Sequence, residues 1–450
     1  MQGGAAAILG IKRQHFLECG HRTGAVAELR RGFADREPRG GEGGLRLGSL
    51  REQVGSGGEI AASGEIAAER VASVGKEIAG RSEGGDGQCG PRIGASMPYL
   101  PTMRPEELLC PTPSGLCSRR GGFHIDPTRP VERALITHGH SDHARAGHGA
   151  VLATAETLDI MRLRYGPDFA GSVQAIRYGD EIRLGDTEVS FHPAGHVLGS
   201  AQIRVAAQGC RVVASGDYKD VADPTCAPFE LVPCDVFITE ATFGLPVFRH
   251  GDPMAEVKKL LASAALFPDR GHLVGAYSLG KAQRVIALIR AAGYDKPVYL
   301  HGAMETITRY YASRVDLGEL RLVRDAAKAE LAGAIAICPP SALQDRWTRR
   351  FPDPVAAFAS GWMRVRARAR QRGVELPLVI SDHCDWEGLT KTVDATGASE
   401  VWVTHGAEEA LVHWCETRGL AARPLHMIGY GEEEDAGEAP ADPAGDGTPA

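Results

Sequence analysis

The stretch His138-Gly139-His140-Ser141-Asp142-His143 decides the fold prediction, because it places four possible metal ligands within six residues. It follows the apolar run Ala-Leu-Ile-Thr, so the chain is predicted to leave a strand here and enter a loop. At such a strand end, His138 and His140 can point to one side while the turn aims Asp142 and His143 at a second position. Imidazole and carboxylate together suit zinc or manganese. The spacing therefore predicts a site for two metal ions rather than a polar surface loop.

Three more candidate ligands lie at the predicted ends of other strands, each close to glycine. His196 lies in a loop flanked by glycines, Asp217 follows the buried-strand pattern 211–215, and His405 ends the apolar strand 400–404. Strands of an α/β protein deliver such side chains to one edge of the sheet. Each residue taken alone could be structural. Together they fill the coordination shells of two metals, and Asp217 can bridge them.

This order of motifs resembles the metallo-β-lactamase superfamily, in which HxHxDH, a later His, a strand-end Asp and a C-terminal His hold two metals on an αββα sandwich. The resemblance covers most of residues 97–430. Glu240 and His383 lie in segments similar to motifs A and B of the β-CASP nucleases, and His405 matches motif C. The long insertion between Glu240 and His383 is where that branch places its second domain.

Three sequence segments resemble one bacterial subgroup more specifically. This subgroup is the ligase-associated DNA damage response exonucleases, also described as mRNA 3′-end processing factor-like exonucleases. The three segments are 110–116, 223–229 and 242–246. Two residues depart from the related proteins: Ala241 stands where Ser is frequent, and Cys384 stands where Ala is common. Neither departure removes a ligand.

The resemblance implies a metal-dependent nuclease that hydrolyses phosphodiester bonds, with two divalent cations, zinc or alternatively manganese, neutralising the diester and making hydroxide at neutral pH. His383, oriented by Glu240, is implied as the proton donor to the leaving 3′ oxygen. In the alternative interpretation, Glu240 is a strand-end acid whose hydrogen bonds are satisfied within the protein, and His383 donates a hydrogen bond to one of the metal ligands. The implied metal ligands are His138, His140 and His196 for one cation, Asp142, His143 and His405 for the other, and Asp217 between them; the implied catalytic residues are Asp142, Asp217, Glu240 and His383.

Two regions of the insertion are candidates for binding nucleic acid. An apolar strand, a glycine-containing loop and an alanine-rich helix place Lys281 and Arg284 near a helix start, which is a ready anion site. The competing interpretation is an ordinary Rossmann-like turn with Lys281 solvated. Further on, the segment 362–372 alternates arginine with small residues. On a strand, Arg364 and Arg366 would form a one-sided row for phosphate contacts, whereas a flexible basic loop is the alternative and is favoured for its distal part.

The net charge of −7 over 450 residues is unusual for a protein that binds nucleic acid. Seven acids and no base lie in the tail 432–450, which is predicted to be disordered; without them 50 acidic residues face 50 basic ones. A neutral body with a local basic face can bind nucleic acid at short range. The 10 cysteines form no CxxC pair and no apolar run could span a membrane, which predicts a reducing bacterial cytoplasm.

Strands alternate with helices over 151–235 and again after His272, which predicts an α/β fold throughout. The resemblance implies a metallo-β-lactamase domain split into 97–243 and 376–431. A Rossmann-like β-CASP domain, 244–375, would close over the metals.

Residues 1–96 are rich in Gly, Glu, Arg and Ala and are predicted to be a disordered extension. Residues 59–78 are its one predicted helical stretch, and Met97 would make a natural start for the enzyme proper. A targeting peptide is the competing interpretation, but the segment lacks a long apolar core.

Several functions remain open on these residues. A cleft between two domains fits single-stranded or end-exposed nucleic acid, and the resemblance favours DNA, with a DNA ligase and a helicase as repair partners. A ribonuclease of the same architecture is the alternative, because no residue reads the 2′-hydroxyl. A non-catalytic nucleic-acid scaffold would require an incomplete ligand set. A small-molecule thioester or lactam hydrolase would not need the insertion.

Overall fold

The structure is a computed structural model that describes residues 103–425 and residue 427. Every described residue belongs to one unit of the chain, 93–450. Four predictions lie outside the described residues: the disordered extension 1–96, its helical stretch 59–78, the start at Met97 and the acidic tail 432–450.

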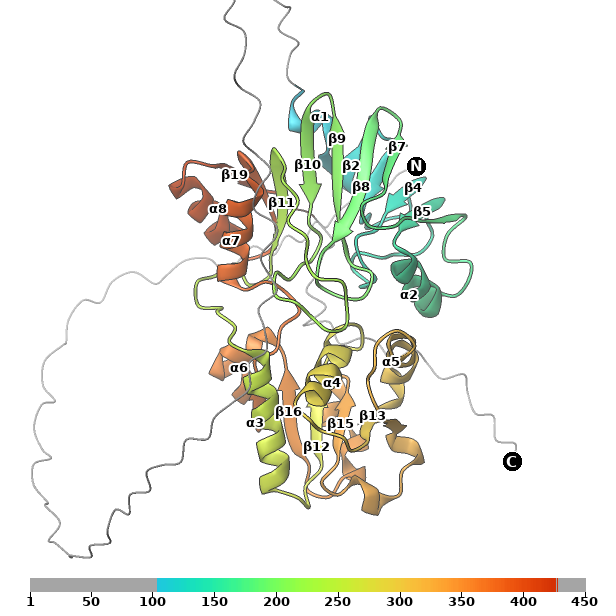
Figure 1. Cartoon of the computed structure of the whole chain (residues 1–450), viewed down its shortest axis with the longest axis vertical. Coiled ribbons are helices and arrows are strands. Elements are labelled where there is room, and N and C mark those ends of the chain that lie inside the picture. The colour runs from blue at the N-terminus through green and yellow to red at the C-terminus, as the bar shows by residue number, and fades with distance from the viewer. Residues whose placement is uncertain (1–102, 426, 428–450) are drawn as a thin grey trace, which may run out of the picture. The chain divides into compact units, whose positions relative to one another are not determined.

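The first sheet has six strands in the order β1-β2-β3-β4-β5-β6 (Figure 1). Strands β1 to β3 pair antiparallel, and β3 to β6 pair parallel. A short helix, α1, precedes the sheet, and α2 follows β5. The bounds are α1 Pro105–Leu108, β1 Cys110–Thr112, β2 Gly115–Ser118, β3 Phe123–Ile125, β4 Arg133–Leu135, β5 Ala150–Ala153, α2 Ala155–Tyr165 and β6 Val173–Ala175.

The second sheet has seven strands in the order β19-β18-β11-β10-β9-β8-β7. Its first four strands along the chain, β7 to β10, form an antiparallel meander, whereas β10, β11, β18 and β19 pair parallel. The bounds are β7 Glu181–Leu184, β8 Thr187–Pro193, β9 Ala201–Ala207, β10 Cys210–Ala214, β11 Val236–Ala241, β18 Glu400–Gly406 and β19 Ala421–Pro424.

The predicted alternation of strands and helices over 151–235 is wrong for most of that range. After α2 the structure has five consecutive strands, β6 to β10, before β11. The turns between β7 and β8 and between β9 and β10 have two residues each. Gly185, Gln208 and Gly209 in these turns have φ of 53°, 48° and 80°. Such left-handed residues match the twist of paired strands, so the chain returns at once as a hairpin instead of crossing over through a helix.

The two sheets pack face to face, and helices cover their outer faces. Alternate residues of a strand face opposite sides of its sheet. In β10, Val212 joins the core shared by the two sheets, whereas Val213 packs with residues of α7 (Trp386–Thr396) and α8 (Glu408–Thr417). Leu158 of α2 packs against the outer face of the first sheet. This is the αββα sandwich that was predicted.

The third sheet is entirely parallel, with the order β14-β13-β15-β12-β16-β17. Apolar residues of α3, α4 and α5 form one core with its strands. Strand β17 pairs with β16 just beyond the predicted boundary at residue 375, and the domain limits stay a prediction. The bounds are α3 Pro253–Leu266, β12 His272–Gly275, α4 Lys281–Ala291, β13 Val298–Leu300, α5 Glu305–Ala312, β14 Leu320–Leu322, β15 Ile335–Cys338, β16 Val355–Ala359, α6 Arg366–Gln371 and β17 Leu376–Leu378, with 3-10 turns η1 Gly302–Met304, η2 Val323–Asp325, η3 Lys328–Leu331, η4 Pro340–Gln344, η5 Arg346–Arg350 and η6 Gly361–Arg364.

Helix α5 of the insertion contacts the sandwich beside the metal-ligand loops. The Tyr310 hydroxyl donates to Asp159 Oδ2 of α2 at 2.9 Å. The Leu198 N–H, in the loop that carries His196, donates to the Tyr311 hydroxyl at 3.0 Å. These contacts hold the third sheet against the loops that carry the candidate ligands.

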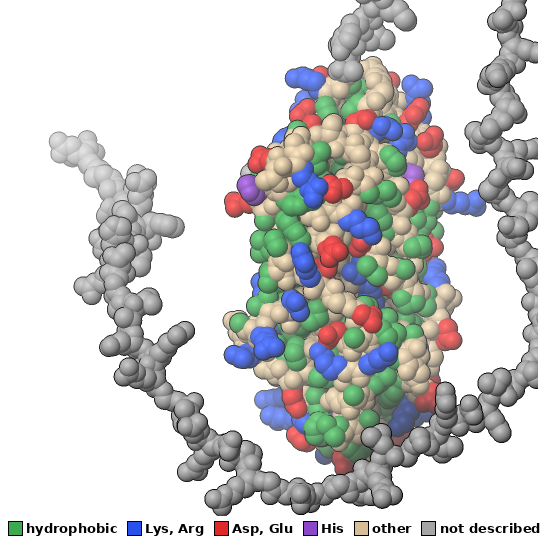
Figure 2. Space-filling model, turned by 60° about the vertical axis from the view of Figure 1, so that its left-hand side comes forward, with side chains coloured by type: hydrophobic (Ala, Val, Ile, Leu, Met, Phe, Trp, Pro, Cys, Tyr) green, Lys and Arg blue, Asp and Glu red, His purple; other side chains and the backbone are tan. Residues whose placement is uncertain are grey.

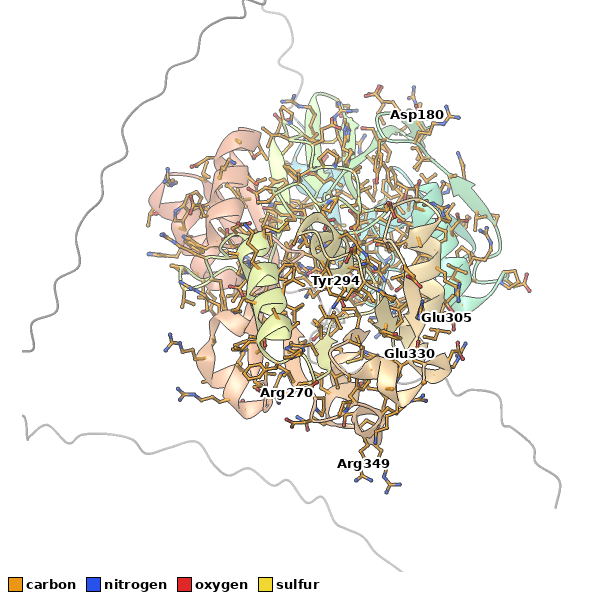
Figure 3. All side chains as sticks on the ribbon, turned by 60° about the horizontal axis from the view of Figure 1, so that its bottom comes forward. Asp180, Arg270, Tyr294, Glu305, Glu330 and Arg349 are labelled. Carbon is orange, nitrogen blue, oxygen red and sulfur yellow. The ribbon has the colours of Figure 1, made fainter. Side chains whose placement is uncertain are left out.

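The arginine-rich segment 362–372 is not a strand, contrary to one prediction. Residues Gly361–Arg364 form η6 and Arg366–Gln371 form α6. Alanine and arginine are both strong helix formers, and residues two apart on a helix point about 200° away from each other, so no one-sided row forms. Basic and acidic side chains are interspersed over the face in Figure 2. Arg270 and Arg349 project from the part of the fold that holds the third sheet (Figure 3).

Candidate active site

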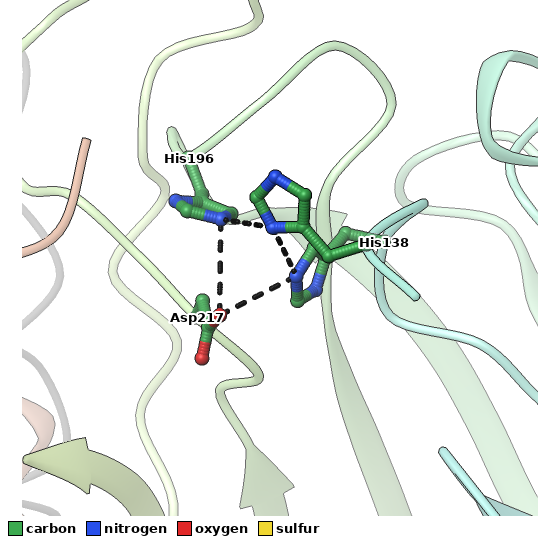
Figure 4. Close-up of side chains that lie close together, drawn as sticks. His138, His196 and Asp217 are labelled. Carbon is green, nitrogen blue, oxygen red and sulfur yellow. Dashed lines mark hydrogen bonds and ion pairs between the residues drawn. The ribbon is translucent and has the colours of Figure 1, made fainter. Parts of the chain in front are cut away.

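Four buried side chains meet where strands of the sandwich end (Figure 4). One ligand atom each of His138, His140, His196 and Asp217 lies within 4.8 Å of the other three. His140 Nδ1 is 3.1 Å from both His138 Nε2 and His196 Nε2. Asp217 Oδ2 is 3.4 Å from His138 Nε2 and 3.8 Å from His196 Nε2. Ligand atoms of a tetrahedral zinc lie about 3.3 Å apart, so this cluster fits one divalent cation.

A second group of ligands shares Asp217 with the first. His143 Nε2 is 3.6 Å from Asp142 Oδ2 and 3.5 Å from Asp217 Oδ2. The ring of His405 has its centroid 5.3 Å from that of His143. His405 has φ of 59°, a left-handed backbone that non-glycine residues rarely adopt and that concentrates at functional sites. Imidazole and carboxylate donors of this kind would suit a second cation, and Asp217 lies close to both groups.

The first three histidines are oriented by hydrogen bonds on the ring nitrogen that faces away from the cluster. Histidines that bind metals usually donate their other N–H to an oxygen, which fixes the tautomer and the ring orientation. The same arrangement exists here before any metal is considered. The partners are Thr137 Oγ1 for His138 at 3.0 Å, the Leu279 carbonyl for His140 at 3.2 Å and the Asp382 carbonyl for His196 at 2.9 Å.

Asp126 orients His143 and was missed by sequence reasoning. Its Oδ2 accepts from His143 Nδ1 at 2.8 Å, and its carboxylate also accepts from the N–H and the hydroxyl of Thr137 at 2.8 and 2.5 Å. Asp126 is buried and has φ of 42°. It directly follows β3, just as Asp217 follows a strand end, so the same signal could have found it. Asp126 leaves Nε2 of His143 for the metal site.

Burial favours the neutral form of three ligand imidazoles, whereas the carboxylates of Asp217, Asp142 and Asp126 outweigh burial at His143 and raise its pKa well above the usual value. Burial lowers the pKa of His196 to about 3 and that of His405 to about 4, and neighbouring histidines add to both shifts. The pKa of His138 is lowered well below its usual value for the same reasons. Because only neutral imidazole binds a cation, these three side chains are ready ligands near neutral pH.

Glu240 and His383 form a buried pair beside the first cluster. Glu240 is the second-last residue of β11, and both of its carboxylate oxygens are 3.0 Å from His383 Nδ1. The Tyr218 N–H holds Oε1 of Glu240 at 2.9 Å. Burial lowers the pKa of His383, but the charge of Glu240, its hydrogen bond and the charges of Asp217 and Asp382 together outweigh burial and raise that pKa to about 10. The ring of His383 lies 4.6 Å from that of His196. A protonated imidazole is therefore held next to the cluster.

The structure buries two of the basic residues predicted to bind nucleic acid. Lys281 begins α4, is 1% exposed, and its Nζ is 3.1 Å from Asp382 Oδ1. Arg284 is also buried and pairs with the carboxylate of Asp223. Both cations thus have acidic partners inside the protein. Their role in binding nucleic acid stays a prediction.

Arg364 and Arg366 are exposed at the end of η6 and the start of α6. Neighbouring Arg368 stacks its guanidinium over the ring of Trp362, 3.8 Å from the centroid. The two exposed arginines are free to meet a ligand from solvent. Their contact with nucleic acid also stays a prediction.

Several curated proteins are similar in sequence to the chain, whereas no family model matches it. A probable DNA ligase of Opitutus terrae is 28% identical over 344 residues, which cover 74% of this chain and 33% of the relative. Ribonuclease TTHA0252 of Thermus thermophilus is 27% identical over 43% of this chain and 53% of its own. An RNase J-like protein of Methanocaldococcus jannaschii is 22% identical over 50% of this chain and 59% of its own. The chain spans between a third and three fifths of these relatives.

A sandwich that carries the HxHxDH cluster at its strand ends, with a parallel-sheet domain inserted before the last ligand, defines a class of metal-binding hydrolase folds. Together with these similarities, it supports the predicted resemblance of the chain to the metallo-β-lactamase superfamily, in its β-CASP branch. The predicted resemblance is confirmed at that level. In the described part of the chain, no helix is both long and apolar enough to cross a membrane.

Proposed function

We propose that the chain is a metal-dependent hydrolase of phosphodiester bonds in nucleic acid. The observation that carries this proposal is the shared carboxylate of Asp217, which lies within 4 Å of ligand nitrogens of both groups. Such an arrangement is what a two-metal hydrolase requires. Nitrogen-rich sites suit zinc, which we take as the metal, with manganese as the alternative.

We assign three residues to each cation and one to both. Bound there, the two cations would neutralise the anionic diester and activate water. Asp126 accepts the proton on His143 Nδ1, so His143 keeps a lone pair on Nε2 for the site. The assignments are His138, His140 and His196 for the first cation, Asp142, His143 and His405 for the second, and Asp217 for both.

The proton for the leaving 3′ oxygen is assigned to His383. Its Nδ1–H remains on the carboxylate of Glu240, so the proton transferred is the one on Nε2. Glu240 thereby orients the ring of His383 and stabilises its protonated form. If His383 only supported a metal ligand, its removal would change metal affinity more than the rate of the chemical step.

We propose DNA ends as the substrate, hydrolysed stepwise during repair, with an ATP-dependent DNA ligase and a helicase as partners. The similarity that supports this covers 74% of the chain and lies within a longer protein named a probable DNA ligase. The ligand set itself acts on a phosphodiester and does not discriminate between the two sugars.

RNA is the second candidate substrate. Two of the similar proteins are named as ribonucleases, from Thermus thermophilus and Methanocaldococcus jannaschii. An RNA-processing enzyme would use the same ligands and the same proton donor.

Digestion of matched single-stranded DNA and RNA tests the proposal. Each strand is labelled at its 5′ or its 3′ end and incubated with metal-loaded protein, with Asp217→Ala as the control. We expect stepwise shortening of DNA, and the label that is lost first gives the polarity. Preferential cleavage of RNA would overturn the assignment to DNA. No cleavage of either strand by metal-loaded protein would overturn the nuclease proposal itself.

A further inference from the structure

An aromatic cluster borders the proposed proton donor. It consists of Phe243, Phe248, His250 and Trp362, and Phe243 is its centre. The ring of Phe243 lies 4.5 Å from His250, 4.9 Å from Trp362 and 5.1 Å from Phe248, measured between centroids. On its remaining side, Phe243 is 6.2 Å from the ring of His383. The cluster therefore adjoins the place where the leaving group would lie.

Two polar groups in this cluster are buried without a hydrogen-bond partner. Among the described residues, none bonds to Nδ1 or Nε2 of His250 or to Nε1 of Trp362, and these atoms have almost no solvent contact. A buried donor or acceptor left unpaired costs about 1–3 kcal/mol. Native proteins contain few buried polar groups without a hydrogen-bond partner. Binding of a ligand that pairs with these groups is one explanation for them.

The backbone fixes where His250 lies. Its own N–H donates to Asp385 Oδ2 at 2.7 Å, and Asp385 Oδ1 caps α7 by accepting from the Gly388 N–H at 3.0 Å. On the other side of the ring, a Cβ at Gly361 would lie 2.8 Å from His250 Nε2. Only glycine lets the start of η6 approach the ring this closely. The position of His250 is thus set by two separate segments of the chain.

The charges around His250 favour an anion. Burial lowers the pKa of His250 to about 3, and the nearby ammonium of Lys219 lowers it further, as does that of Lys281, while Asp385 acts in the opposite direction. The Lys219 ammonium is itself buried and donates to the carbonyl of His383 at 3.0 Å. The guanidinium of Arg368 lies over Trp362. Neutral hydrogen-bonding groups near the buried Lys219 ammonium suit an oxygen-rich anionic ligand.

We propose that His250 and Trp362, on either side of Phe243, form a binding subsite for the non-bridging oxygens of the backbone phosphate next to the scissile one. The inference rests on the proposed function, because the ligand is the nucleic-acid strand whose neighbouring phosphodiester would be cleaved beside His383. Rotation about χ2, a broad torsion in histidine, presents a ring nitrogen to the phosphate, and the indole N–H of Trp362 donates to the same group.

Kinetics of the metal-loaded full chain on a single-stranded oligonucleotide test the subsite. His250→Leu removes both nitrogens and should raise KM about 10- to 100-fold, the effect of losing a hydrogen bond to a charged group, with a smaller change in kcat. Trp362→Phe keeps a ring, removes the N–H and should raise KM in the same direction. His250→Gln restores a donor and should recover part of the loss. His413→Ala, at an exposed position of α8, is the matched control.

Thermal unfolding separates a lost contact from a damaged fold. Because an unpaired buried polar group is replaced by an apolar one, the midpoint of His250→Leu should equal or exceed that of the parent protein. A substrate with one neutral methylphosphonate at the linkage beside the scissile one completes the test. The parent protein should bind it about tenfold more weakly, whereas His250→Leu should not distinguish the two substrates.

Equal sensitivity of parent and variant to the methylphosphonate would overturn the subsite, and so would an unchanged KM in His250→Leu. Both outcomes leave the nuclease proposal intact, because the parent protein still cleaves the strand. Failure of the parent protein to cleave any nucleic acid would overturn the proposed function and the subsite with it.

Discussion

The sandwich and the inserted domain use their charged residues in opposite ways. At the strand ends of the sandwich, His138, His196 and Asp217 converge on one small volume, and their ligand atoms face each other. In the insertion, Lys281 and Arg284 each have a buried acid as partner. The residue types alone would have suggested two binding sites. Convergence of several ligand atoms favours a site for a ligand, whereas pairing of each cation with one buried acid favours a structural role.

The largest expected effect comes from the shared carboxylate. Asp217→Ala should lower kcat by at least about 10³-fold, because metal ions supply several kcal/mol of transition-state stabilisation and Asp217 contacts both groups. Steady-state hydrolysis of the preferred strand measures the loss. Retention of most of the parent rate would show that the two ligand groups do not act through Asp217. Asp235→Ala, which removes an exposed ion pair with Arg211, is the control for loss of an aspartate.

Removing the proton donor should have the next largest effect. His383→Ala is expected to lower kcat about 10²- to 10⁴-fold while metal content stays at the parent value. A variant that loses metal in proportion to activity would instead support a role in metal binding. Rate and metal content are therefore measured on the same preparations.

The pH profile gives a finer test of the same pair. His383 is protonated below its pKa of about 10, so the rate should fall as pH rises through that value. Glu240→Gln removes the charge that raises this pKa, and the basic limb of the profile should move to lower pH. If the basic limb of the Glu240→Gln profile stayed at the same pH, that limb would not report the titration of His383.

Breaking a buried pair of the insertion should cost stability. Lys281→Met leaves the carboxylate of Asp382 without this partner and should lower the free energy of unfolding by about 3–5 kcal/mol. Lys391→Met, whose side chain is 77% exposed, should stay within about 0.5 kcal/mol of the parent. Denaturant unfolding compares the two. A Lys281→Met variant that is as stable as the parent but binds nucleic acid weakly would reverse the distinction drawn between the two regions.

The smallest expected effect concerns the exposed arginines. If Arg364 and Arg366 contact phosphates, each alanine substitution should lower the slope of log affinity against log salt by about one and weaken binding equally for all sequences. The side chain of Arg349 points away from the ribbon in Figure 3, so Arg349→Ala is the matched control. Equal slopes for all three variants would remove η6 and α6 from the proposed binding face.

The sequence predicted the sandwich and the clustering of His138, His140, His196 and Asp217 because the information is local. An apolar strand that ends in His or Asp beside glycine is visible in a few residues, and parallel strands bring such ends together. Asp126 carries the same signal after β3 but was missed, because it is a partner of a ligand and belongs to no motif.

Contacts over long distances along the chain could not be predicted in this way. The pairing of Lys281 with Asp382 and of Arg284 with Asp223 joins segments that are 61 or more residues apart. The hairpins of the second sheet depend on left-handed turn residues such as Gln208, for which the residue type is a weak signal. The helix α6 arose where alternation indicated a strand, because the propensities of alanine and arginine outweighed the period of two.

Metal content, measured by mass spectrometry on metal-free protein reloaded in steps, tests most directly whether two cations share Asp217. We expect the parent protein to bind two zinc ions per chain and to reach full activity only with the second, and Asp217→Ala to retain fewer than two under the same conditions. Full activity at one ion per chain, or two tightly held ions in Asp217→Ala, would contradict the shared site.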